Sequence, residues 1–359
     1  MRYDPREGAR NLLLNCVGIR PGQRIVIAAE DPAEDFYDAL ASRCILEIAT
    51  ELGCQASLLP CPCISGPESL PSSIIRAMED ADHVIFQARA GDQVRFTQLA
   101  GTATKTMSYA LDIGLLGSEY CTLHHGLMKE VFNTFESELN SVASWRITCP
   151  LGTDVSGTQS SMDAAAGNGE DFTLLLFPIP IFRPLRCETM QGRVAVSHWL
   201  MSTANRVYQN SFLKLDEPVM AVVEAGRIVD FEGPKDLVGK VRSHYQRVGN
   251  LFDIEADVVH SWHAGIHPKA FYPLKATSDI DRWGSVAFAN PRYLHFHTCG
   301  NYAPGETAWS IFDATVELDG QVYWNRGHFT FIDRTDLRKR LVHYDLDDWA
   351  FEQRFDIGV

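Results

Sequence analysis

The chain has 359 residues, of which 45% are hydrophobic and 22% are charged, so it is long enough for about two globular domains. Its net charge of −14 repels nucleic acid phosphates and anionic lipids, which argues against both as binding partners. No segment approaches the ~20 consecutive apolar residues of a membrane span, and the N-terminus lacks a signal-peptide pattern. We therefore expect a cytoplasmic protein whose partner is a small-molecule substrate.

Residues 1–150 show a pattern of alternating strands and helices. Helical spacing of apolar residues predicts helices over 8–17, 32–52, 69–80 and 118–140. Short apolar runs predict strands over 24–30, 55–59 and 83–89. Strands separated by helices are typical of a parallel sheet with helices on its faces, so we expect an α/β domain over residues 1–150. The acidic turn after the first strand lacks a glycine-rich phosphate loop, which disfavours nucleotide binding.

Residues 151–359 change to short strands joined by turns. One alternating segment, 218–233, turns at Ala225-Gly226, and a second, 314–327, turns at Asp319-Gly320, as hairpins do. A helical pattern covers 237–248 between them. We therefore expect an α/β protein in which the parallel-sheet domain is followed by a mainly antiparallel, β-rich domain over residues 151–359 that carries the active site.

The stretch 260–306 is rich in imidazole groups. It contains five of the chain's 12 histidines, followed by a carboxylate: His260, His263, His267, His295, His297 and Glu306. If the segment YLHFH is a strand, His295 and His297 share one face, because alternate strand residues point the same way. Two imidazoles and one carboxylate can form an open metal site, so we predict His263, His297 and Glu306 as metal ligands. The alternative is a polar cleft without metal, with Glu306 as an ordinary turn residue.

Several phrases together resemble a known enzyme superfamily. They are GIRPGQRIVIAAE in the first half, HAGIHPKAF before the His-rich strand, and the final LDG hairpin. The arrangement resembles, over nearly the whole chain, the fold shared by the metallo-aminopeptidases of the aminopeptidase T family and 2,5-dihydroxypyridine 5,6-dioxygenase. The superfamily's metal-ligand pattern is altered here. One ligand position falls on Ser261, and a His-x-Asp pair falls on Glu306 and Ala308, whereas a His and Tyr seven residues apart are matched by His295 and Tyr302.

The resemblance implies a metal-dependent enzyme that acts on a small polar molecule. Its most concrete form is a non-haem Fe(II) dioxygenase that opens a hydroxylated N-heteroaromatic ring, with Tyr302 and His295 as catalytic residues that move protons. One alternative is an aminopeptidase-like metallohydrolase that uses Zn or Co. Another is a metal-free relative with a binding, scaffold or acid–base role, which the altered ligand pattern favours. The resemblance also implies a homodimer.

Overall fold

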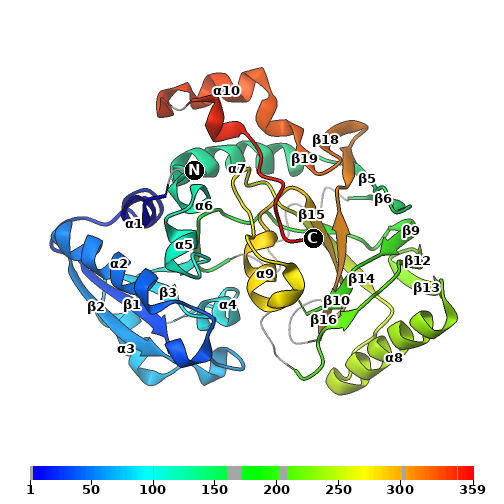
Figure 1. The fold of residues 1–359 in the computed structure, drawn as a ribbon, viewed down its shortest axis with the longest axis horizontal. Helices are drawn as coiled ribbons and strands as arrows, with labels where there is room; N and C mark the ends of the chain where they lie inside the picture. The colour runs from blue at the N-terminus through cyan, green and yellow to red at the C-terminus, as the bar shows by residue number, and fades with distance from the viewer. Residues whose placement is uncertain (1–2, 100, 160–171, 203–207, 301–304, 346) are drawn as a thin grey trace.

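The computed structural model describes residues 3–99, 101–159, 172–202, 208–300, 305–345 and 347–359. Its N-terminal half, with strands β1 to β4, lies on one side of the molecule, and the antiparallel strands of the C-terminal half lie on the other (Figure 1). Helix α9 (Ile280–Ala287) connects the two halves, since Arg282 binds Asp112 of the first half at 2.6 Å. In the described part of the chain, no helix has the length and apolar character needed to span a membrane.

The first sheet contains five parallel strands in the described residues, in the order β2-β1-β3-β4-β7. The bounds of its strands are Arg24–Glu30 (β1), Gln55–Cys61 (β2), His83–Gln87 (β3), Thr104–Ser108 (β4) and Leu175–Phe177 (β7). Every residue of the central strand β3 is buried, as expected for a strand with helices on both faces. The first half also contains the helices α1 (Pro5–Arg10), η1 (Asn11–Val17), α2 (Ala39–Glu51), α3 (Ser72–Asp80), α4 (Ala90–Val94) and α5 (Ile113–Leu116). The predicted parallel sheet is confirmed.

In two of the predicted helices, a side chain that caps the backbone sets different bounds in the structure. The helix expected over 32–52 begins only at Ala39, where Asp38 accepts a hydrogen bond from the backbone N–H of Leu40. The single helix expected over 118–140 is wrong. It is divided into α6 (Glu119–Thr122) and α7 (His125–Leu139), and Nδ1 of His124 accepts from the N–H of Gly126. Histidine is an unusual cap, so the break was not predicted.

The C-terminal part forms two antiparallel sheets. In the described residues, one has the strand order β11-β10-β16-β15-β14-β8 and the other the order β13-β12-β9-β6-β5-β17-β18-β19. The strands of the first are β8 (Leu185–Arg186), β10 (Trp199–Met201), β11 (Leu213–Lys214), β14 (Val259–Ala264), β15 (Tyr293–Cys299) and β16 (Glu306–Phe312). Those of the second are β5 (Ser144–Thr148), β6 (Asp154–Thr158), β9 (Gln191–Val196), β12 (Val219–Glu224), β13 (Arg227–Glu232), β17 (Thr315–Leu318), β18 (Gln321–Asn325) and β19 (His328–Phe329).

The α/β class and both predicted hairpins, β12–β13 and β17–β18, are confirmed. The helix predicted over 237–248 is longer, as α8 (Lys235–Phe252), and α10 (Thr335–Leu341) follows the last strand. The chain passes between the sheets more than once, since β5 and β6 precede β7, which pairs with β4 in the parallel sheet. The division into two domains at residue 150 stays a prediction.

A layer of tryptophans packs between the two antiparallel sheets. It determines which residues of β14 face away from that interface. Trp262 of β14 packs against Trp145 and Trp324, with ring centroids 5.8 and 6.3 Å apart, and all three are buried. Burial of such large rings stabilises the sheet contact by several kcal/mol in total, at about 25 cal/mol per Å² of apolar surface. Because strand residues alternate, Ser261 and His263 on either side of Trp262 point to the opposite face.

Candidate functional site

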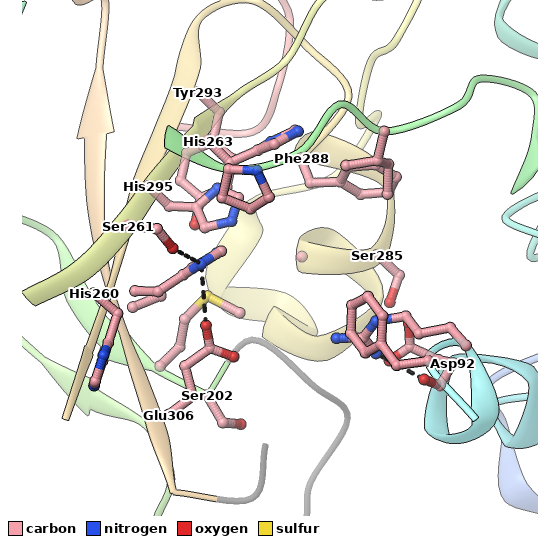
Figure 2. Close-up of a pocket in the computed structure, with 18 of the residues that line it drawn as sticks. Asp92, Ser202, His260, Ser261, His263, Ser285, Phe288, Tyr293, His295 and Glu306 are labelled. Carbon is pink, nitrogen blue, oxygen red and sulfur yellow. Dashed lines mark hydrogen bonds and ion pairs between the residues drawn. The ribbon is translucent and has the colours of Figure 1, made fainter. Parts of the chain in front are cut away.

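A cavity of about 160 Å³ lies on this opposite face of the β14–β15–β16 sheet. Its remaining walls come from α4 and α9, from residues that follow β4 and β10, and from residues between 172 and 186, up to β8. Figure 2 shows Ser261, His263, His295 and Glu306 along one side, with Asp92 and Ser285 on the other. The cavity is therefore built by elements of both halves of the molecule.

Strand register brings the predicted histidines together. His263 of β14 pairs with His295 of β15, and Ser261 pairs with His297, so that all four side chains project from one face. The ring centroids of His263 and His295 are 5.6 Å apart, and those of His295 and His297 are 4.8 Å apart. Glu306, the first residue of β16, lines the same cavity. The structure thus places His263, His295, His297 and Glu306 in one site.

These histidines are held in their neutral form. Burial, reinforced by the neighbouring imidazoles, lowers the pKa of His263 and of His297 well below the usual range. Burial also lowers the pKa of His295 to about 4. Among the described residues, Nε2 of His263 and Nδ1 of His295 are buried without a hydrogen-bond partner. Neutral imidazole with a free nitrogen is the form that binds a metal ion or accepts a proton.

Ser261, His297 and Glu306 form a contact group within the site. Oγ of Ser261 lies 2.9 Å from Nδ1 of His297, and Oε1 of Glu306 lies 3.4 Å from the same nitrogen. Burial raises the pKa of Glu306 to about 8, although Arg95 acts in the opposite direction. Near pH 7 the Glu306–His297 contact therefore joins a mainly protonated acid to a neutral imidazole and is not an ion pair. Both contacts use Nδ1 of His297, so neither involves its other ring nitrogen, Nε2.

The donor set fits a divalent transition metal in its chemistry. Neutral imidazoles and a carboxyl group are ligands that Fe, Zn and Co accept, and the unpartnered nitrogens of His263 and His295 are suitable donors. The described residues nevertheless contain no group of three or more His, Cys, Asp and Glu side chains arranged to hold a metal ion. The ligand set His263, His297 and Glu306 therefore stays a prediction.

Other residues singled out in the sequence have different outcomes. Tyr302 lies outside the described residues. His260 lines the cavity but directs Nε2 to the carbonyl oxygen of Cys299, 2.6 Å away, and its ring points away from His263 and His295 in Figure 2. Lys269, two residues after His267, donates to the carbonyl of Glu352 at 2.7 Å.

Sequence reasoning missed the wall that the N-terminal half contributes. Arg95, directly after α4, forms an ion pair with Asp92 through Nη1 at 2.9 Å, and the hydroxyl of Tyr109 donates to Asp92 at 3.4 Å. All three line the cavity. Helix α4 is only five residues long, and its surrounding sequence RAGDQVRF matches no site motif, so no local signal marked these residues.

This chain is similar to known proteins in its structure. No known protein family and no curated protein matches the sequence. The structure of 2,5-dihydroxypyridine dioxygenase from Pseudomonas putida KT2440 is similar over 90% of this chain and 95% of that one, with a TM-score of 0.58 and 12% identity. The structure of AmpT from Thermus thermophilus is similar over 90% of this chain and 98% of that one, with a TM-score of 0.49 and 13% identity. The first of these structures confirms the expected resemblance to the dioxygenase at the level of the fold.

Proposed function

We propose that this protein is a metal-dependent enzyme that opens a hydroxylated N-heteroaromatic ring with O2 in the cavity beside β14, β15 and β16. The observation that carries the proposal is the set of three neutral imidazoles and one carboxyl group on a single face of these strands. A fold shared with a dioxygenase supports it, since the similar structure covers 90% of the chain. The cavity volume of about 160 Å³ restricts the substrate to a small molecule.

In this proposal, His263, His297 and Glu306 would hold the metal. Ferrous iron, when bound, would supply the one-electron chemistry that O2 needs to react with an aromatic ring. Glu306 must lose its proton to act as a ligand, and because its pKa is raised to about 8, metal affinity should increase from pH 6 to pH 8. His295 is neutral and carries an unpartnered Nδ1, so it can accept a hydrogen bond from a ring hydroxyl and orient it.

A metal-free acid–base enzyme is a second candidate, because Glu306 is a buried carboxyl group whose pKa is raised to about 8. In that case Glu306 would be the proton donor, since a carboxyl with a pKa of about 8 is protonated near neutral pH and can release its proton readily. His297, 3.4 Å from Glu306, would position the acid.

Metal analysis of the purified protein separates the candidates. We expect about one equivalent of iron per chain, lost on chelation together with activity and restored by ferrous iron. We expect His297→Ala to lose iron binding, whereas His260→Ala, whose ring faces the carbonyl of Cys299, should retain it. Stoichiometric zinc or cobalt would favour a metallohydrolase. Turnover by a chelated, metal-free protein would contradict the first proposal and support the acid–base enzyme.

A further inference from the structure

The cavity wall opposite the histidines carries a buried cation. The side chain of Arg95 is 15% exposed, and its one ion pair in the described residues, with Asp92, uses Nη1, which also donates to the backbone carbonyl of Asp92 at 2.7 Å. A guanidinium has five N–H donors in a planar fork. Nε and Nη2 of Arg95 therefore remain as donors for a ligand. The side chain of Asp92 is 12% exposed, and its carboxylate pairs with only one nitrogen of the guanidinium, Nη1.

Two pairs of aromatic rings line the same cavity as this cation. The ring centroids of Phe96 and Phe172 lie 5.0 Å apart, and those of Tyr109 and Phe288 lie 4.9 Å apart. All four residues line the cavity, and the guanidinium of Arg95 lies 4.8 Å from the centroid of Phe96. Aromatic walls bind planar rings, and an arginine fork binds planar carboxylates. The combination suits one molecule that contains both groups.

The size of the cavity restricts that molecule further. A cavity of about 150 Å³ is known to hold one benzene ring, so about 160 Å³ holds a single ring with small substituents. Arg95 lines the same cavity as His295 and His297. The cation and the histidine group therefore face the same space.

We infer that the substrate is a monocyclic aromatic carboxylate whose carboxylate is bound by Arg95 and whose ring lies between the aromatic walls, with its other polar group toward His295 and His297. The inference rests on the proposed function for the reaction, but binding at Arg95 does not require the metal. Asp92 is a built-in competitor in this arrangement, because its carboxylate already occupies Nη1 and repels a second anion.

The other charged residues of the cavity modify this picture without replacing it. Arg186 also lines the cavity, but its guanidinium pairs with Glu188 at 2.8 Å. Asp281 contributes a second carboxylate from α9. Among the described residues, the cavity lining has two cations and two anions besides Glu306, so these charges together do not attract anions in general. Recognition of a carboxylate must therefore depend on direct contact with a particular guanidinium.

Binding of nicotinate and nicotinamide to the metal-free protein tests the inference. The two probes have the same ring and similar shape, and only nicotinate carries a carboxylate. By isothermal titration calorimetry we expect the wild-type protein to prefer nicotinate by at least about tenfold, the effect of one charge-assisted hydrogen-bond pair. Arg95→Gln should abolish the preference with little change in nicotinamide affinity. Asp92→Asn should bind nicotinate several-fold more tightly, because it removes the competing carboxylate.

The control is Arg186→Gln, which removes the other cation of the cavity and should keep the preference. Equal binding of the two probes by the wild-type protein would overturn the inference, as would loss of the preference in Arg186→Gln but not in Arg95→Gln. Thermal unfolding of each variant establishes that it is folded, and the gain expected for Asp92→Asn cannot come from damage to the fold. Since metal is absent throughout, failure here is distinct from failure of the iron analysis.

Discussion

Glu306 occupies a position where burial opposes ionisation. Its side chain is 5% exposed and contacts the neutral ring of His297, and its pKa is raised from 4.5 to about 8. The folded protein therefore holds this proton more tightly than the unfolded chain does. The stability that the protonated acid contributes is fully present below about pH 4.5 and is lost as the pH rises toward 8.

We predict that Glu306→Gln makes the metal-free protein less sensitive to alkaline conditions. The amide keeps the size of the side chain and cannot ionise. The free energy of unfolding of the variant, relative to that of the wild type, should therefore increase from pH 5 to pH 9, to the order of a few kcal/mol. Urea unfolding at several pH values measures this difference. Glu317→Gln on β17 is the control and should follow the wild-type pH dependence. Parallel curves for Glu306→Gln and the wild type would show that Glu306 ionises normally.

Helix α4 positions Asp92 and Arg95 because it packs closely against β3 and β4. The close approach requires a glycine: a Cβ at Gly91 would collide with Sδ of Met107 and would lie 2.7 Å from Cβ of Phe86. We predict that Gly91→Ala displaces α4, destabilises the protein by about 1–3 kcal/mol and weakens nicotinate binding. Denaturant unfolding and calorimetric titration measure the two effects.

A matched glycine substitution provides the control for α4. Gly239 lies inside α8, and nothing would contact a Cβ there within 4 Å. Gly239→Ala should therefore stabilise the protein by about 0.5–1 kcal/mol through helix propensity, with nicotinate affinity unchanged. If Gly91→Ala behaved in the same way, α4 would not depend on this close contact.

The elements that the sequence predicted well are those whose signal is local. Alternation in YLHFH predicts the shared face of His295 and His297, and the turn at Ala225-Gly226 predicts its hairpin. The cavity wall opposite the histidines has no such signal. Arg95 lies 200 residues before His295, and its position depends on how α4 packs and on how the two halves meet, which no spacing within RAGDQVRF reports. Half of the site was therefore predictable, and the half that contributes Asp92 and Arg95 was not.

Several buried histidines, distributed over both halves, set how the protein responds to acid. Burial lowers the pKa of His125, His244 and His295 to about 4 and that of His267 to about 3, all from a usual 6.5. Between pH 6.5 and about 4 the unfolded chain binds protons that the folded protein does not. The stability from each histidine is therefore fully present above pH 6.5 and is lost as the pH falls, by up to about 1.4 kcal/mol per pH unit.

His244 of α8 tests this dependence away from the cavity. Its Nδ1 lies 3.2 Å from Nη2 of Arg247, and its buried Nε2 has no partner among the described residues. In His244→Asn, the amide oxygen can still accept from Arg247, but the proton uptake of the unfolded chain is lost. We predict that the unfolding free energy of the variant falls less steeply between pH 6.5 and 4, with a slope that corresponds to about one proton fewer than in the wild type. This holds whatever the stability of the variant at pH 7. Urea unfolding across this range measures the slope, and an unchanged slope would mean that His244 takes up its proton in the folded protein as well.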